Sequence, residues 1–479
     1  MVEKPGIEGT HHHRPVLAVP GGEASGFLYS RAVHNLLDLN IVAGRSADEP
    51  PRFIRAGAHY PDPWTRDAAI NAWNAASFLA PDVARDTLVM VCQGSDEPIL
   101  AQDDQWWDQI IWVLAAWHHY LATGDREFLA WARGVGARSL AILHERRFRP
   151  AHGLYAGGAV MQDGISGYPR PPWEPGNGSS FVLDYPPAHE LMCLSTNTLY
   201  VGALRTLAAM SRALDAPEES FDERADALAS AIDAQLWRPT ARQYGYLLHG
   251  SGDAEGSVAD DEEACGIAFA ALFGVADPDL ARDILRRTHR QPQGVVNVWP
   301  HFPERFSDEQ PGRHNAVCWP MVMGMFGSTA AVVGESAVFE QNLDDLERLF
   351  LGSDGEFFEI YNAINGEVDG GWQEGAHWPS EPHQTWSATA YLRMIHHGVL
   401  GMRLSEDGIR FAPIVPERFD GATLSAFRYR DSSLTITVTG SGDRLASVRL
   451  DGRLVDGDVH LPASLSGHHE VVLEMERLK

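Results

Sequence analysis

The sequence is poor in cysteine and has no long apolar run. Its four cysteines, Cys92, Cys193, Cys265 and Cys318, lie far apart in apolar, helix-like contexts. Such spacing favours buried free thiols over disulfides, as is typical of a reducing compartment. No stretch of about 18 apolar residues occurs, and the N-terminus lacks a charged segment followed by an apolar one. We therefore predict a cytoplasmic protein with no membrane span and no secretion signal.

Positive charge is also scarce. The chain has 38 Lys and Arg against 65 Asp and Glu, which gives a net charge of -27. This balance disfavours nucleic acid and anionic membrane surfaces as partners. A glycine-rich phosphate loop, the Cys/His spacing of a zinc site and an EF-hand loop are all missing from the sequence. We therefore expect no cofactor and no metal, and the sequence contains no indication of the oligomeric state.

Residues 60–79, YPDPWTRDAAINAWNAASFL, join a polar mouth to an apolar helix. Two prolines keep the first part extended, and Thr65 is positioned to cap a helix that begins at Arg66. The rest is apolar on every side, so this helix is predicted to lie inside other helices. Its mouth carries Trp64, Arg66 and Asp67, an aromatic ring beside hydrogen-bonding charges, which suits a sugar. The alternative is that Asp67 only interacts with the helix dipole and Arg66 only pairs with it.

Helical periodicity recurs along the chain, because segments that are apolar nearly all round alternate with charged, amphipathic ones. This alternation predicts a mainly α fold, a closed toroid of helical hairpins joined pair by pair. About twelve segments are predicted. They are residues 25–42, 60–79, 81–92, 103–123, 125–148, 195–214, 218–237, 261–273, 277–288, 314–333, 335–351 and 384–400.

Composition divides the chain into three regions. Residues 1–24 are rich in Pro and Gly and are predicted to be an extended segment, and residues 25–401 form the helical domain. Short alternating runs with Gly and Asp turns predict a small antiparallel β domain over residues 402–479. Two long irregular insertions, 150–194 and 351–383, interrupt the helices. Loops of this length inside a compact domain are usually functional.

Four short motifs occur in the order and spacing of a known group of enzymes: WTRD at 64–67, EIYN at 359–362, NG at 365–366 and TWSA at 385–388. With the helical pairs they make residues 55–400 resemble the six-hairpin glycosidases. The resemblance is greatest to the glycoside hydrolase family 63 and mannosylglycerate or glucosylglycerate hydrolase group. It implies an (α/α)6 barrel that hydrolyses an α-glycoside with inversion, using an Asp acid and a Glu base. The β region is similar to domains appended to helical-barrel phosphorylases and rhamnosidases.

An inverting glycosidase needs a protonated carboxyl at the leaving oxygen and an ionised carboxyl that activates water. The resemblance implies Asp163, in the first insertion, as the acid, and the alternative is that its Asp-Gly pair forms a surface turn. The resemblance implies Glu359 as the base, with Glu356 as its rival, because a local shift in alignment exchanges the two. We expect a raised pKa for Asp163 and an ionised Glu359.

Aromatic rings and forked hydrogen-bonding groups complete the expected site. Rings can stack on sugar faces, although a core role is the alternative for each Trp. Forked polar groups can bind sugar hydroxyls, although helix capping is the alternative for Asn197. The predicted substrate-binding residues are Tyr60, Trp64, Arg66, Asp67, Asp104, Trp106, Asn197, Trp372, Gln373, Trp378 and Trp386.

Together these features predict an exo-acting glycoside hydrolase with a small-molecule carbohydrate as substrate, a small α-linked glucoside or a related glycosylated compound. A phosphorylase on the same barrel would use inorganic phosphate in place of water. A sugar epimerase would depend on histidines such as His189, His314 and His377. A non-enzymatic carbohydrate-binding protein is the remaining alternative, and the length of the chain disfavours it.

Overall fold

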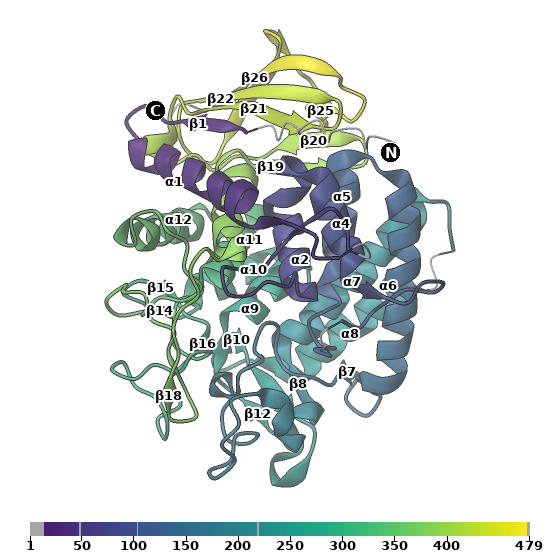
Figure 1. Cartoon of the computed structure of the whole chain (residues 1–479), viewed down its shortest axis with the longest axis vertical. Helices are drawn as coiled ribbons and strands as arrows, with labels where there is room; N and C mark the ends of the chain where they lie inside the picture. The colour runs from purple at the N-terminus through teal and green to yellow at the C-terminus, as the bar shows by residue number, and fades with distance from the viewer. Residues whose placement is uncertain (1–13, 47–48, 103, 218–219, 477–479) are drawn as a thin grey trace, which may run out of the picture.

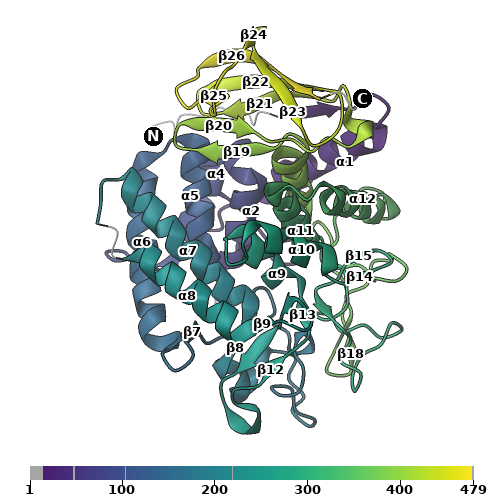
Figure 2. The same ribbon diagram turned by 180° about the vertical axis from the view of Figure 1, so that it is seen from behind.

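The computed structural model describes residues 14–46, 49–102, 104–217 and 220–476. Helices form the body of the molecule, a layer of strands covers one end, and long loops with short strands occupy the other end (Figures 1 and 2). The predictions for residues 1–13, 103, 218–219 and 477–479 lie outside the described residues.

The helices agree with the predicted segments, each of which contains a helix. Three π-helical stretches continue or join them: Asn35–Leu39 after α1, Ala72–Ala76 between α2 and α3, and Met394–Val399 after α13. The helices are α1 (Glu23–His34), α2 (Thr65–Asn71), α3 (Ser77–Leu79), α4 (Pro81–Met90), α5 (Ile111–Thr123), α6 (Arg126–Arg147), α7 (Leu194–Ala213), α8 (Phe221–Leu236), α9 (Ala264–Leu272), α10 (Pro278–Arg287), α11 (Pro320–Val333), α12 (Ser336–Gly352) and α13 (Thr385–Arg393).

Local chemistry explains several helix ends. Asp125 accepts a hydrogen bond from the Phe128 amide at the start of α6, and Asp277 caps α10 in the same way ahead of Pro278. Gly124 ends α5 in the left-handed conformation, with φ of 79°. The predicted cap at Thr65 is wrong: α2 begins at this residue, and its hydroxyl donates to the Gln102 side chain instead.

The buried helices contact one another in sequence around a closed ring. Helix α2 packs against α5, α5 against α7, α7 against α9, α9 against α11 and α11 against α13, which packs against α2. The amphipathic helices α4, α6, α8, α10 and α12 each pack outside this ring on a helix adjacent in sequence, whereas α1 packs on α12 and α13. The alternation of apolar and amphipathic segments therefore reflects an inner and an outer layer.

The C-terminal ends of the inner helices face the strand layer. Strand β19 (Met402–Ser405) contacts α5 and the π-helical end of α13. The guanidinium of Arg430 donates to the Leu121 carbonyl near the end of α5, and that of Arg403 donates to the Ala331 carbonyl near the end of α11. The N-terminal ends of these helices therefore open toward the long loops at the other end (Figure 1).

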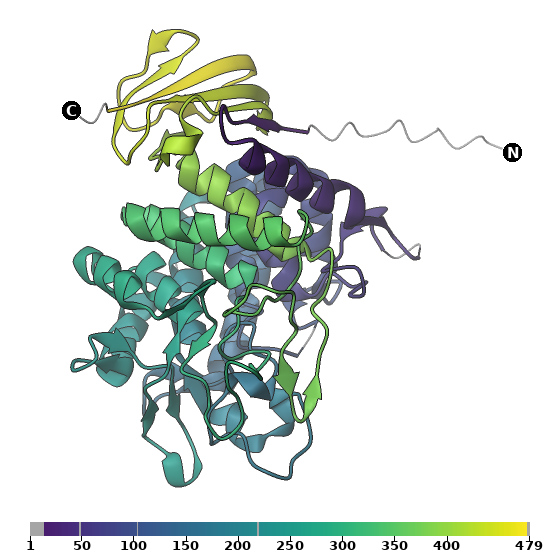
Figure 3. The same cartoon turned by 90° about the vertical axis from the view of Figure 1, so that its left-hand side faces the viewer.

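The strand layer contains a six-stranded sheet, ordered β1-β21-β22-β26-β23-β24, and a three-stranded sheet, β19-β20-β25. Its pairs are antiparallel, as predicted, except β22 with β26, which run parallel. Strand β26 inserts between β22 and β23, which run in opposite directions, and can oppose only one of them. Strand β1, from the predicted N-terminal segment, pairs with β21 (Figure 3).

The strands of this layer are β1 (Val16–Ala18), β19, β20 (Gly408–Phe411), β21 (Thr423–Tyr429), β22 (Ser432–Thr439), β23 (Leu445–Leu450), β24 (Arg453–Leu454), β25 (Leu461–Pro462) and β26 (Gly467–Met475). Short strands among the helices and loops are β2 (Ile41–Ala43), β3 (Arg52–Ile54), β4 (Cys92–Gln93), β5 (Ile99–Leu100), β6 (Phe148–Arg149), β7 (Leu154–Tyr155), β8 (Leu191–Cys193), β9 (Trp237–Arg238), β10 (Gln243–Tyr244), β11 (Leu247–His249), β12 (Val258–Ala259), β13 (Glu262–Glu263), β14 (Arg290–Gln291), β15 (Gly294–Val295), β16 (Val298–Trp299), β17 (Trp372–Gln373) and β18 (Ala376–His377).

The four cysteines are free thiols, as predicted. Cys193, Cys265 and Cys318 are buried and Cys92 is partly buried.

We expect Phe427→Ala to lower the free energy of unfolding by about 3–5 kcal/mol, because the substitution leaves a cavity where two layers meet. Phe427 is buried in β21, and its ring centroid lies 5.1 Å from those of Phe78 and His396 in the inner helices. Denaturant unfolding measures the change. Leu454→Ala, at an exposed strand position, is the control and should change stability little. Equal costs for both variants would contradict the packing of the strand layer on the helices.

Candidate active site

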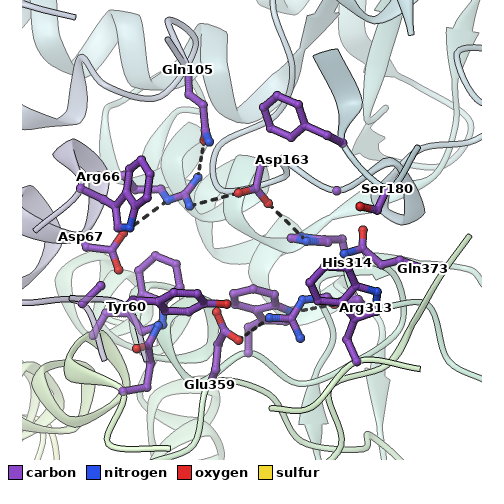
Figure 4. Close-up of a pocket in the computed structure, with 18 residues that line it drawn as sticks. Tyr60, Arg66, Asp67, Gln105, Asp163, Ser180, Arg313, His314, Glu359 and Gln373 are labelled. Carbon is purple, nitrogen blue, oxygen red and sulfur yellow. Dashed lines mark hydrogen bonds and ion pairs between the residues drawn. The ribbon is translucent and has the colours of Figure 1, made fainter. Parts of the chain in front are cut away.

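A cavity of about 260 Å³ opens at the N-terminal ends of α2 and α13, between the two long insertions (Figure 4). Chain segments that are far apart in sequence meet there because the inner helices form a ring. The lining residues are Ala56, Tyr60, Trp64, Arg66, Asp67, Gln105, Asp163, Gly164, Ser180, Phe181, Arg313, His314, Trp319, Glu359, Gln373, Trp378, Gln384 and Trp386.

Both predicted catalytic carboxyl groups line this cavity. Asp163 lies on one side of the view in Figure 4 and Glu359 on the other. Most of the predicted substrate-binding residues line it as well, namely Tyr60, Trp64, Arg66, Asp67, Gln373, Trp378 and Trp386. The roles of these residues remain predictions, but their placement together is a property of the structure.

Four predicted binding residues lie elsewhere. Asp104 and Trp106 line a separate pocket beside α6. Asn197 is fully buried, and its amide bonds the backbone of Tyr155 and the Cys193 carbonyl, so its polar atoms are used inside the fold. Trp372 is not among the lining residues: its backbone pairs with His377 in a hairpin, and its ring packs on that histidine. We leave these four out of the proposed binding site.

Asp163 is held by two basic side chains. One carboxylate oxygen lies 3.6 Å from Nη2 of Arg66, and the other lies 3.3 Å from Nε2 of His314. Arg66 also contacts the carboxylates of Asp67 and Asp108 and the Gln105 amide oxygen, which fixes the orientation of its guanidinium. The Asp163 side chain remains 32% exposed toward the cavity, where a ligand can reach it.

The pKa of Asp163 shifts in the direction opposite to the predicted one. Burial alone raises it, but the positive charges of Arg66 and Arg313 outweigh burial and lower the pKa below its usual value. Burial lowers the pKa of His314 to about 3, so we treat this ring as neutral at neutral pH and Arg66 as the main cause. The sequence showed an enclosed carboxyl group but not the guanidinium beside it.

Glu359 has a different environment. Its carboxylate lies 2.5 Å from Nη2 of Arg313, and both side chains are almost fully buried. The other guanidinium nitrogen of Arg313 donates to the carbonyls of Gly370 and Pro379, so the second insertion is tied to the carboxylate. Burial raises the pKa of Glu359, and the Arg313 charge offsets this only in part. The pKa of Glu359 is thus raised above its usual value, and its ionised state in the reaction stays a prediction.

Glu356, the rival of Glu359, and a second glutamate of the same insertion, Glu374, are engaged outside the cavity. Glu356 accepts hydrogen bonds from the backbone and ring of His383. Glu374 pairs with Arg305. Among the described residues, the carboxylates that line the cavity belong to Asp67, Asp163 and Glu359. The position of Glu359 therefore favours it over Glu356 as the partner of Asp163.

Three aromatic rings form an exposed edge of the cavity. Trp64, Trp378 and Phe181 are 40%, 41% and 36% exposed, although rings of this size are usually buried. Trp64 precedes α2 with a positive φ of 36°, a conformation that non-glycine residues seldom adopt and that clusters at functional sites. Exposed rings beside polar groups suit the apolar face and the hydroxyls of a sugar.

Sequence reasoning missed several lining residues, including Arg313, Trp319, Gln105 and Gln384. A usable signal was present for two of them. Trp319 immediately precedes the apolar helix α11, as Trp64 precedes α2, and Arg313 lies a short way upstream of it. Attention to the residues before α11, as well as those at the mouths of the other apolar helices, would have found them.

Among the described residues, no group of three or more His, Cys, Asp or Glu side chains is placed to hold a metal ion. None of the helices that the structure describes is both long enough and apolar enough to cross a bilayer.

Residues 60–387 match the family model of the mannosylglycerate hydrolase MGH1-like glycoside hydrolase domain. This match contains every lining residue of the cavity except Ala56 and covers more than half of the chain. The chain belongs to this family of glycoside hydrolases. Residues 402–454 match the model of the C-terminal domain of glycosyl hydrolase family 65, so the strand layer has its own relatives.

Solved structures of glycosidases have similar folds. The GH63 mannosylglycerate hydrolase of Thermus thermophilus, in complex with glucose, aligns with a TM-score of 0.58 and 16% identity, over 77% of this chain and 99% of that one. A GH78 rhamnosidase from Bacillus sp. GL1 aligns with a TM-score of 0.59 and 16% identity, over 98% of this chain and 44% of that one. At this identity the likeness shows the fold.

Two further matches cover only part of the other protein. A sialidase aligns with a TM-score of 0.67 and 16% identity, over 94% of this chain, which spans 41% of that protein. The rice (Oryza sativa subsp. japonica) Fe-S cluster assembly factor HCF101, chloroplastic, is 36% identical over 69 residues. That local match covers 14% of this chain and 13% of the rice protein.

Proposed function

We propose that this glycoside hydrolase is exo-acting and inverting and cleaves a small α-linked glucoside or a related glycosylated small molecule. One observation carries the proposal. Asp163 and Glu359, from different insertions, line the same small cavity, and each has its own basic partner. Two carboxyl groups with different surroundings are what separate acid and base roles require.

In the proposed reaction, Asp163 gives its proton to the glycosidic oxygen as the bond to the anomeric carbon breaks. The protein surroundings of Asp163 favour its ionised form, so substrate binding has to raise its pKa. A sugar that fills the cavity displaces the water around this partly exposed carboxyl and strengthens the effect of burial. The working acid is thus formed in the complex with substrate.

Glu359 acts as the base and removes a proton from the water that attacks the anomeric carbon from the other side. Arg313 orients its carboxylate and leaves one oxygen available for that water. Burial beside Glu359 also raises the pKa of Tyr60, so the phenol stays protonated and can donate to a sugar oxygen. The anomeric centre is inverted because acid and base act on opposite faces.

The size of the cavity supports a small substrate. Pockets for drug-sized ligands span about 300–1,000 Å³, and this cavity, at about 260 Å³, suits one sugar ring with a small aglycone. The aromatic edge made by Trp64, Trp378 and Phe181 offers faces for that ring. A single short cavity also favours removal of a terminal sugar over cleavage within a polymer.

We further infer that the helical domain is an (α/α)6 toroid. The closed series of contacts from α2 through α5, α7, α9 and α11 to α13 supports this architecture, as do the outer helices paired with them. In such a toroid the helix mouths converge on the axis, where the cavity lies. The cytoplasmic location and the exclusion of nucleic acid remain predictions from the sequence.

The electrostatics favour hydrolysis over phosphorolysis. Within the described residues, the guanidinium groups that line the cavity are those of Arg66 and Arg313, and both pair with carboxylates. Inorganic phosphate would need a cation that is not already neutralised. The epimerase alternative has less support: of its three histidines only His314 lines the cavity, while His189 and His377 bond the Leu183 carbonyl and Asp369.

Product analysis by proton NMR tests the proposal. The enzyme is incubated with α-linked disaccharides and glycosyl-glycerates, with and without phosphate, and the first-formed anomer is recorded. We expect release of a free β-anomer from an α-linked substrate at a rate that phosphate does not change. A sugar phosphate would indicate a phosphorylase, an α-anomer would indicate retention, and loss of substrate without a second product would indicate an epimerase.

We expect Arg313→Gln to move the acidic limb of the kcat profile, which reports the complex with substrate, to higher pH. The base must be ionised, and Arg313 is the positive charge that limits the rise in the Glu359 pKa. Removal of an adjacent opposite charge shifts a carboxyl pKa by about 1–3 units. Activity at low pH should therefore fall more than activity at high pH.

Arg305→Gln is the matched control for this variant. Arg305 also pairs with a glutamate of the second insertion, Glu374, but neither residue lines the cavity. It should leave the acidic limb in place. A profile that Arg313→Gln lowers uniformly, without a shift along the pH axis, would contradict the coupling of Arg313 to the base.

A further inference from the structure

A second cavity, here called the α6 pocket, lies on the outer side of the helices. It has a volume of about 140 Å³ and opens between α6, strand β5 and the turn that precedes α5. Trp106 and Asp104, which the sequence suggested as sugar-binding residues, line this pocket together with Gln109, Arg146 and Arg147. The glycoside hydrolase reaction proposed above uses none of these five residues.

The α6 pocket has an excess of positive charge. Arg146 and Arg147 both line it, and no acidic side chain of the described residues lies within ion-pair distance of either guanidinium. Arg147 stacks on the ring of Trp106, with its central carbon 3.6 Å from the ring centroid. Burial lowers the pKa of Arg147, the neighbouring charges of Arg149 and Arg146 lower it further, and the charge of Glu190 offsets part of this. The two guanidinium groups of Arg146 and Arg147 are suited to binding a carboxylate.

A buried polar group in the same pocket has no partner. Gln109 is only 3% exposed, and its Oε1 makes no hydrogen bond to any described residue. A buried amide oxygen without a partner costs about 1–3 kcal/mol, and buried side chains of this kind are usually satisfied. A ligand that carries a hydroxyl group would satisfy it. Asp104, exposed at the rim, offers a second acceptor.

We propose that the α6 pocket binds a small hydroxylated carboxylate of three or four carbons. The carboxylate would lie against the Arg146 and Arg147 guanidinium groups, and a hydroxyl would donate to Oε1 of Gln109. The volume corresponds to about five waters at ~30 Å³ each, which excludes a disaccharide. Arg147 already covers the Trp106 face, so that ring is not available to stack on a sugar.

The α6 pocket and the larger cavity lie on either side of the same turn of chain, residues 105–109. Trp106 and Gln109 line the α6 pocket, while Gln105 and Asp108 contact Arg66 in the other cavity. Neighbouring residues of this turn thus serve different cavities. The binding proposed here does not depend on the reaction proposed for the larger one.

Isothermal titration of the full chain with D-glycerate tests the proposal, because this probe carries a carboxylate and two hydroxyl groups. Propionate lacks the hydroxyls and glycerol lacks the charge, so both should bind at least about 10-fold more weakly. Arg146→Gln removes a charge-assisted contact and should weaken D-glycerate binding about 10–100-fold. Gln109→Leu should weaken it about 5–10-fold. Arg126→Gln, on the same helix but outside the pocket, should have no effect.

Two results would overturn the proposal. Affinity that survives both Arg146→Gln and Gln109→Leu would place any bound D-glycerate elsewhere, including in the larger cavity. Equal affinity for propionate and D-glycerate would show that the hydroxyl groups, and therefore the Gln109 oxygen, contribute nothing to binding. Arg146 is exposed, so its replacement should leave the fold intact, and near-UV circular dichroism of each variant checks this.

Discussion

Glu359→Gln should lower kcat by about 10²–10⁴-fold on every substrate, whatever its leaving group. The substitution keeps the shape of the side chain but removes the carboxylate that activates water. The substitution also leaves the Arg313 guanidinium without its negatively charged partner, because this guanidinium donates to the Glu359 carboxylate in the native site. A good leaving group cannot compensate, because the step that fails is attack by water. Steady-state kinetics on an α-glycoside and on the corresponding glycosyl fluoride measures the effect.

Glu374→Gln is the control for that experiment, since Glu374 lies in the same insertion but does not line the cavity. It should keep most of the activity. Added azide gives a second readout, because this small nucleophile needs no general base and fits into space vacated by the water. Full activity of Glu359→Gln on glycosyl fluorides would contradict the assignment of Glu359 as base.

Asp163→Asn should lower the rate on ordinary α-glycosides by about 10²–10⁴-fold and spare glycosyl fluorides. Fluoride departs without protonation, so the loss of the acid matters little for that substrate. The variant also removes the negative charge that faces Arg66 and His314. The ratio of rates on fluoride and on glycoside should therefore rise steeply, and this ratio is the quantity to measure.

Asp184→Asn is the corresponding control. Asp184 lies in the same insertion, where its carboxylate accepts a hydrogen bond from the Ser179 hydroxyl, and it does not line the cavity. Its replacement should leave the ratio unchanged. If Asp163→Asn loses equal activity on both substrates, Asp163 serves binding or orientation of Arg66 instead of proton transfer. If it loses none, the carboxyl has no part in the reaction.

The helices were predictable because their signals are local. A buried helix such as α11 needs apolar residues on every side, and a boundary such as the start of α10 needs a capping Asp followed by Pro, as at Asp277. These patterns lie within a few turns of chain, so they can be read without the rest of the protein. Residues 60–79 showed both the helix and its polar mouth for this reason.

The site was predictable where polar residues lie next to an apolar helix or match a family motif. Trp64, Arg66 and Asp67 at the mouth of α2 and Glu359 in its motif all line the cavity. The same reasoning failed for Trp106 and Asn197. Trp106 follows Gln105 directly yet faces the α6 pocket. The side-chain amide of Asn197 is hydrogen-bonded to the backbone of β7 and β8. Neighbours in sequence can face different cavities, and the sequence does not show which.

By itself, then, the sequence determined the order of the helices and the separate strand region, and the family resemblance singled out Asp163 and Glu359 as the predicted acid and base. Only the tertiary structure decided how these parts meet. The pairing of β1 with β21, the parallel run of β22 beside β26 and the placement of Arg66 against Asp163 all join segments far apart in the chain. The physical reason is that pairing and charge interactions depend on distance in space. The pKa of Asp163 is lowered because a guanidinium lies 3.6 Å away, and no local pattern records that distance.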